Sequence, residues 1–252
     1  MFGVYVLGTA GCGKSLLTHS LKNWLTSKEW HVITANLDPG AESLPYDPDV
    51  DVRLHLDLHE LMERYQLGPN GALVLASDML ATKAQEIQDE IDSCNADIVI
   101  FDTPGQMELF AYRPSGQFLA SNFAADGKAV LFLYDAWLCK TPENFLSLNL
   151  LASSVRLRFN LPFISVLNKA DIAKEEAKQA MKWASNPRLL EASLGEALKG
   201  DDYSLYSSLL RGLVRNGFVH RMIPSSAATM EGMTAIASEL FMLFKGGEDS
   251  EA

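Results

Sequence analysis

Short, mostly apolar runs recur along the chain, and each is followed by a polar turn and a longer segment. They occupy residues 2–7, 31–37, 97–101, 129–134 and 162–167. Runs of this length, bounded by turn signals, are typical of parallel strands that are buried on both faces. One more short strand is expected near 219–223. The pattern predicts a mostly parallel sheet.

Helical periodicity fills the segments between these strands. The clearest example runs from Ser15 to Ser27, where leucines recur on one helical face, at Leu16, Leu17, Leu21 and Leu25. A final helix is expected at about 231–244. Strands that alternate with helices imply βαβ units with right-handed crossovers. The predicted fold is an α/β, doubly wound sheet with helices on both faces, whose ligands bind at the carboxyl ends of the strands.

Residues 174–217 interrupt this alternation, because they are rich in Ala, Leu, Lys and Glu and contain no strand-like run. They are expected to form a helical insertion within a single domain that spans 1–252. Residues 246–252, with the sequence GGEDSEA, are expected to form a short flexible tail.

Composition and charge narrow the range of ligands. The chain is 48% hydrophobic and 21% charged, as in packed globular proteins. Its formal net charge of -11 argues against direct binding of nucleic acid, and no apolar run approaches the roughly 20 residues of a membrane span. Cys12, Cys94 and Cys139 form no CxxC pair, which favours a reducing, cytoplasmic compartment.

The segment Gly8-Thr9-Ala10-Gly11-Cys12-Gly13-Lys14-Ser15 satisfies the P-loop pattern G-x4-G-K-[ST] between a predicted strand and a predicted helix. Backbone N–H groups of such a loop surround phosphate oxygens, while Lys14 reaches the β- and γ-phosphates and Ser15 places its hydroxyl on Mg²⁺. The alternative is a glycine-rich turn with a surface lysine. The predicted nucleotide-binding residues here are Gly11, Cys12, Gly13, Lys14, Ser15 and Leu16, and the fold is of the P-loop NTPase type.

A second polar motif, Asp102-Thr103-Pro104-Gly105-Gln106, follows the apolar run 97–101. At this strand end, Asp102 is expected to orient a magnesium water, as the Walker B aspartate does. Gly105 is expected to donate its N–H to the γ-phosphate, so that loss of this phosphate releases the loop. The alternative is a turn that binds no ligand.

A third motif, Asn168-Lys169-Ala170-Asp171, follows the run 162–167 and matches N-K-x-D. Asp171 is expected to accept hydrogen bonds from guanine N1–H and the N2 amine, and Lys169 to lie along the base plane. Adenine lacks this pair of donors, so GTP is favoured over ATP. Near the last strand, the N–H of Ala227 is expected to meet guanine O6, although an ordinary strand-end loop explains that segment equally well.

With these motifs in place, the chain resembles the GPN-loop GTPases over residues 1 to about 172, and more loosely beyond. The resemblance rests on the three motifs above together with Gly68-Pro69-Asn70, Asn36-Leu37-Asp38-Pro39 and the stretch from Tyr46 to Arg53. The chain departs from the family pattern at Gly40, where alanine is expected.

The resemblance implies a homodimer of the archaeal type, in which Asn70 in the GPN loop (68–70) of one subunit acts at the phosphate site of the other. It places Asp38 in the first switch, near Mg²⁺ and the attacking water, and Gln106 and Glu108 in the second. The implied catalytic residues are Asp38, Asn70, Gln106 and Glu108, and the implied metal site comprises Ser15, Asp38 and Asp102.

The resulting hypothesis is a dimeric GTPase that hydrolyses GTP to GDP and phosphate with Mg²⁺ and acts as a switch. By the resemblance, it assists the assembly of a protein complex, with a client such as RNA polymerase or its assembly factors. The main alternative is an assembly chaperone or scaffold that is gated by nucleotide and hydrolyses it only incidentally. A small-molecule kinase also uses a P-loop, but has no reason to carry N-K-x-D.

Overall fold

The computed structural model describes residues 1–123, 125–219 and 221–248. Within them, seven strands form one parallel sheet in the order β3-β2-β4-β1-β5-β6-β7. The strands are β1 (Phe2–Gly8), β2 (Val32–Asn36), β3 (Val50–Asp51), β4 (Ile98–Asp102), β5 (Gly127–Asp135), β6 (Phe163–Asn168) and β7 (Met222–Pro224). This confirms the predicted doubly wound α/β class, with a sheet that is parallel throughout.

Two strands differ from the prediction. β3 was not predicted, because it contains only two residues and is defined by pairing with Ala35 and Asn36 of β2. β7 begins at Met222, later than the expected 219, and residue 220 lies outside the described part of the chain.

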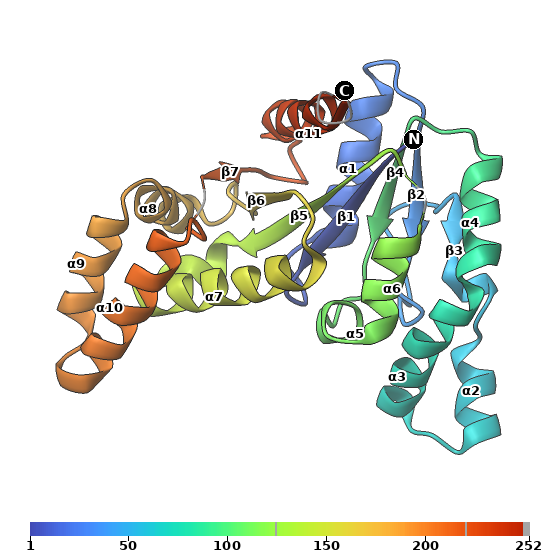
Figure 1. Cartoon of the computed structure of the whole chain (residues 1–252), viewed down its shortest axis with the longest axis horizontal. Coiled ribbons are helices and arrows are strands. Elements are labelled where there is room, and N and C mark those ends of the chain that lie inside the picture. The colour runs from blue at the N-terminus through green and yellow to red at the C-terminus, as the bar shows by residue number, and fades with distance from the viewer. Residues whose placement is uncertain (124, 220, 249–252) are drawn as a thin grey trace.

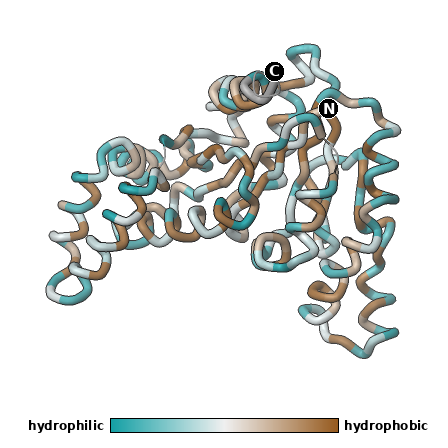
Figure 2. The backbone as a smooth tube through the Cα atoms, viewed as in Figure 1, coloured by the Kyte–Doolittle hydropathy of each residue, from teal (hydrophilic) through white to brown (hydrophobic). Residues whose placement is uncertain are grey.

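The central strand β1 shows why the sheet carries helices on both faces. Successive side chains of a strand point to opposite faces. Val4 and Val6 belong to one core cluster, and Tyr5 and Leu7 belong to the other. All four are almost completely buried. In Figure 2 the hydrophobic segments run along the strands, whereas the outer helices alternate between hydrophobic and hydrophilic residues.

Helices α1 (Lys14–Thr26) and α11 (Met233–Glu248) cover the face of Val4 and Val6. They lie beside one another in Figure 1. The other core cluster includes residues from the remaining longer helices, namely α2 (Leu58–Tyr65), α3 (Pro69–Met79), α4 (Ala84–Ser93), α6 (Pro114–Asn122), α7 (Pro142–Phe159) and the helices between β6 and β7. The short helices are α5 (Glu108–Ala111) and the 3-10 turns η1 (Val52–Leu54), η2 (Leu80–Lys83) and η3 (Ala136–Lys140).

The predicted helical insertion consists of α8 (Lys174–Ser185), α9 (Pro187–Ala197) and α10 (Gly200–Arg215). At the left of Figure 1, α9 and α10 pack side by side. Pro187 occupies the first turn of α9, and the Asn186 side chain caps it by accepting from the Arg188 N–H.

The last helix is longer than predicted. Because α11 runs from Met233 to Glu248, residues 246–248 of the expected flexible tail are helical, and residues 249–252 lie outside the described part of the chain. None of the helices in the described residues combines the length and apolar character that a membrane span requires.

Candidate nucleotide-binding site

The glycine-rich loop between β1 and α1 has a backbone that other residues would strain. Gly11 and Gly13 have φ values of 73° and 94°, in the left-handed region. A Cβ on Gly13 would also lie 2.7 Å from Asn168 Nδ2. Cys12 is completely buried and belongs to the core cluster on the face of Val4 and Val6. The loop therefore has the shape of a phosphate cradle.

Lys14 lies at the centre of this cradle and is only 6% exposed. Its Nζ donates to the carbonyl oxygens of Gly8 at 3.0 Å, Thr9 at 3.1 Å and Gly105 at 3.3 Å. The adjoining pocket, of about 320 Å³, is lined by Gly11, Gly13, Lys14, Ser15, Leu16, Asp38, Pro45, Thr103 and Gly105. The fold thus brings the P-loop together with the segments after β2 and β4.

Asp102 ends β4 next to β1 and is 1% exposed. Its Oδ2 accepts a hydrogen bond from the Tyr46 hydroxyl at 2.9 Å. Burial raises the pKa of Asp102 to about 6, although hydrogen bonds from Ser15 and Tyr46 act in the opposite direction. Burial and the neighbouring carboxylate raise the pKa of Tyr46, so its hydroxyl stays a donor.

The Asp102 carboxylate fits a magnesium site. Its Oδ1 is buried and has no hydrogen-bond partner among the described residues. A buried carboxylate oxygen without a partner is costly, and oxygen ligands beside a phosphate site are those that Mg²⁺ uses. Ser15 and Asp102 are therefore the residues that would hold the ion with its hydration shell.

Asp38 connects the segment after β2 to the segment after β4. Its Oδ2 accepts from the Gly105 N–H and its Oδ1 from the Gly40 N–H, both at 2.9 Å. The Gly105 N–H is the donor that the sequence assigned to the γ-phosphate, so a phosphate oxygen has to compete with Asp38 for it. Gln106 and Glu108 are exposed, and neither is among the residues that line the phosphate pocket.

On the base side, Asn168 joins three loops and is 1% exposed. Its Nδ2 donates to the Cys12 carbonyl at 2.9 Å, and its Oδ1 accepts from the Ala227 N–H at 3.2 Å and the Ser225 hydroxyl at 3.4 Å. The Ala227 N–H is therefore used within the protein here, and its contact with guanine O6 stays a prediction.

Lys169 and Asp171 follow Asn168 at the end of β6. Lys169 has a left-handed backbone, with φ of 64°, and its Nζ forms an ion pair with Asp135 Oδ2 at 2.7 Å. Asp171 lines a pocket of about 600 Å³ together with Lys174 and Met181 of α8 and Thr229.

Tyr46 and Asp135 were missed by the sequence reasoning as members of the site. Asp135 directly follows the apolar run 129–134, so its place at a strand end was a usable signal. Tyr46 lies in a loop without periodicity, and only the hydrogen bond to Asp102, 56 positions away in the chain, reveals its role.

The Gly68-Pro69-Asn70 tripeptide opens a helix. Gly68 is the N-cap of α3 and Pro69 occupies its first turn. Asn70 is exposed and is not among the residues that line the chain's own phosphate pocket. A Cβ at Gly40 would lie 2.4 Å from Leu73 Cδ2 of α3, so the glycine at this position lets the loop after β2 pack against α3.

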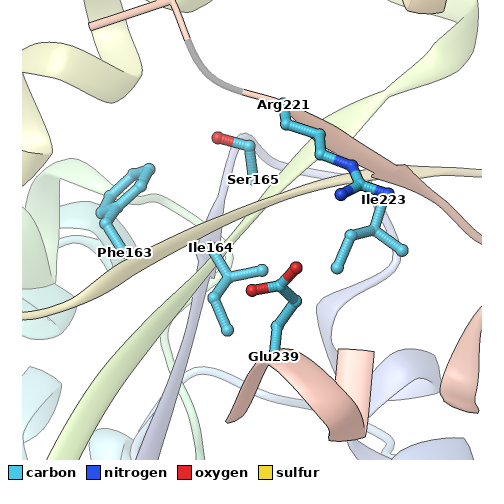
Figure 3. Close-up of a pocket in the computed structure, with 6 residues that line it drawn as sticks. All are labelled: Phe163, Ile164, Ser165, Arg221, Ile223 and Glu239. Carbon is cyan, nitrogen blue, oxygen red and sulfur yellow. The ribbon is translucent and has the colours of Figure 1, made fainter. Parts of the chain in front are cut away.

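A separate small pocket, of about 150 Å³, lies between β6, β7 and α11. Figure 3 shows Arg221, just before β7, and Glu239, on α11, on either side of it. Phe163 and Ile164 begin β6, so this pocket lies at the amino ends of the strands, away from the polar motifs.

Comparison with known proteins finds a matching family model and related proteins that are about 30% identical in sequence. The family model described as "Conserved hypothetical ATP binding protein" matches residues 6–244. GPN-loop GTPase 1 of Saccharomyces cerevisiae is 31% identical over 223 residues, which cover 84% of this chain and 56% of the yeast protein. The chain thus spans about half the length of that relative. GPN-loop GTPase 3 of Eremothecium gossypii is 30% identical over 99% of this chain and 94% of its own length.

The fold has a solved counterpart as well. A GTPase from Pyrococcus abyssi, crystallised in its apo form, superposes with a TM-score of 0.86 and 30% sequence identity. The match covers 96% of this chain and 97% of the other. Both the sheet and the helices between β6 and β7 therefore have equivalents in a protein of known structure.

Proposed function

The chain belongs to the GPN-loop GTPase family, and on this premise we propose that it binds GTP with Mg²⁺ and hydrolyses it to GDP and phosphate. One observation carries the proposal. Lys14, Asp38 and Gly105 line one pocket at the carboxyl ends of β1, β2 and β4, and Asp102, whose carboxylate is buried, directly precedes Thr103 in the same lining. Phosphoryl transfer depends on the positioning of such groups more than on covalent chemistry by the protein.

The choice of guanine over adenine rests on Asp171. Its carboxylate lines the pocket beside α8, where it can accept from the two donors on the guanine edge. Adenine would leave this carboxylate unpaired, which costs several kcal/mol in a closed site. The nucleotide is therefore GTP, although the family model carries a description that names ATP.

The residues around the pocket have different roles in hydrolysis. Lys14 neutralises charge on the phosphates, and the loop N–H groups hold their oxygens. Mg²⁺ supplies further neutralisation of the transferring phosphoryl group. Asp38, released from Gly105 when the γ-phosphate takes that N–H, is placed to orient the attacking water. Water forms the new bond to the γ-phosphorus, the bond to the β–γ bridging oxygen breaks, and the proton of the water leaves with the phosphate product.

Asn70 completes the site from a second subunit in this proposal. Its exposure at the start of α3, outside the lining of its own pocket, supports an action in trans. Contact between Gly40 and Leu73 joins α3 to the Asp38 loop, so docking of a partner at α3 can affect that loop. As a dimeric switch, the protein would assist assembly of a protein complex, with RNA polymerase or its assembly factors as the candidate client.

A complementation experiment tests both hydrolysis and action in trans. Lys14→Ala removes the phosphate contact and Asn70→Ala removes the group that acts across the interface, so each variant alone should release little phosphate from GTP. In an equimolar mixture, half of the dimers are hybrids with one intact site, and about a quarter of wild-type activity should return.

Four results would contradict parts of the proposal. No recovery in the mixture counts against action in trans, and full activity of Asn70→Ala alone does the same. Equal phosphate release from ATP and GTP by the wild type removes the assignment of Asp171. Absence of phosphate release at any protein concentration leaves the scaffold alternative.

A further inference from the structure

Within the part of the chain that the structure describes, Tyr46 is the one residue of the loop between β2 and β3 whose side chain forms a hydrogen bond with Asp102. Its hydroxyl donates to Asp102 Oδ2 at 2.9 Å. Its ring stacks on His19 of α1, with centroids 6.3 Å apart and planes inclined by 10°. The tyrosine is therefore held at two points, by the helix that follows the P-loop and by the carboxylate at the end of β4.

The two oxygens of Asp102 have different environments. Oδ2 accepts the hydrogen bond from the Tyr46 hydroxyl. Oδ1 is buried without a partner in the described part of the chain. A tether with a purely structural purpose would satisfy both oxygens, since an unpaired buried acceptor is destabilising. The bond from Tyr46 instead prevents rotation about the carboxylate axis and keeps Oδ1 unpaired.

We propose that Tyr46 is a positioning residue for the magnesium that accompanies GTP, because its hydroxyl holds the Asp102 carboxylate so that Oδ1 accepts a hydrogen bond from the hydration shell of the ion. The inference rests on the proposed function. It adds that the loop between β2 and β3, which also carries Asp38, senses the metal through Tyr46. Occupancy of the metal site and placement of Asp38 are then linked by one hydroxyl group.

Release of a fluorescent GDP analogue tests this role directly. Tyr46→Phe removes the hydroxyl and keeps the ring against His19. With Mg²⁺ present, the variant should release the analogue about tenfold faster than the wild type, which corresponds to one hydrogen bond to a charged group. With EDTA, the two proteins should release it at the same rate, because there is no metal to position.

The matched control is Tyr112→Phe, which removes another tyrosine hydroxyl, bonded to Ser154 Oγ at 3.0 Å. Tyr112 follows α5 and is not among the residues that line the phosphate pocket. The control variant should release the analogue like the wild type under both conditions. An equal acceleration of Tyr46→Phe with and without Mg²⁺ would overturn the proposal, because the tyrosine would then act on the nucleotide or the loop alone. No acceleration under either condition overturns it as well.

A double-mutant cycle shows whether Tyr46 acts through Asp102. Asp102→Asn should weaken Mg²⁺-dependent retention by itself, and adding Tyr46→Phe to it should change the rate less than twofold. Fully additive effects would contradict the proposal. A wild type that retains the analogue equally with and without Mg²⁺ would overturn the proposed function together with this inference, whereas a Mg²⁺-dependent wild type matched by Tyr46→Phe overturns the inference alone.

Discussion

Replacement of Asn168 by alanine tests whether one side chain joins the phosphate side of the site to the base side. Asn168 donates to the Cys12 carbonyl in the P-loop and accepts from the Ala227 N–H in the loop after β7. Asn168→Ala leaves both backbone groups buried without these partners. We expect the protein to lose stability and, separately, to bind guanine nucleotides more weakly.

The magnitude follows from the two lost hydrogen bonds. A buried backbone group left unpaired costs about 1–3 kcal/mol, so the free energy of unfolding should fall by about 3 kcal/mol. The variant also lacks the hydrogen bond from Asn168 Nδ2 that holds the Cys12 carbonyl of the P-loop in place. If half of the lost energy also appears in binding, the Kd for GDP should rise about tenfold, since about 1.4 kcal/mol corresponds to that factor.

Urea unfolding measures the change in the free energy of unfolding. Equilibrium titration with a fluorescent GDP analogue measures the change in Kd. Asn149→Ala is the matched control, because Asn149 is another buried asparagine, 2% exposed, whose Nδ2 donates to the Phe145 carbonyl within α7 at 2.8 Å. It should reduce stability without changing nucleotide affinity. The reasoning fails if both variants bind the nucleotide like the wild type, or if both weaken it equally.

Two further predictions concern single carboxylates. Asp171→Asn should weaken GTP and favour xanthosine triphosphate, whose O2 acceptor matches the amide, and competition titrations that show an unchanged base preference would contradict the role of Asp171. Asp51→Asn should lower the free energy of unfolding by about 2 kcal/mol at pH 7, because Asp51 accepts two bonds from Arg53 Nε, one from Arg53 Nη2 and one from Asn36. Burial alone would raise the pKa of Asp51, but these hydrogen bonds outweigh it and lower the pKa. Stability that depends on a lowered carboxyl pKa is present above its unfolded value of about 4 and is lost as the pH falls through the folded value, so the difference between the variant and the wild type should narrow below about pH 4. Urea midpoints measured from pH 7 to pH 3 decide this, and a constant difference would refute it.

The family and the fold class followed from the sequence because their signals are local. Buried parallel strands appear as continuous apolar runs, and the P-loop, Asp102 and N-K-x-D motifs each follow such a run within a few residues. Since carboxyl ends of parallel strands meet at one edge, these motifs were expected to meet as well. The geometry agrees for the P-loop, Asp38 and Gly105, which line one pocket.

Where the signal was short or ambiguous, the prediction was incomplete. β3 has two residues and exists by pairing with β2, so no periodicity could reveal it. The tail was expected from GGEDSEA, yet α11 continues to Glu248. The glycines at 246 and 247 have low helix propensity, and the length of an amphipathic helix packed on a sheet is decided by its packing as well as by propensity.

The sequence by itself determined which groups are available for chemistry, because strand runs and motif spacing depend on residues close together in the chain. Only the tertiary structure decided how those groups pair. β1 lies between β4 and β5, and this strand order brings Tyr46 to Asp102, Asp38 to Gly105 and Lys169 to Asp135. Such bonds span tens of residues, and their existence depends on which strands are neighbours, which no local pattern contains.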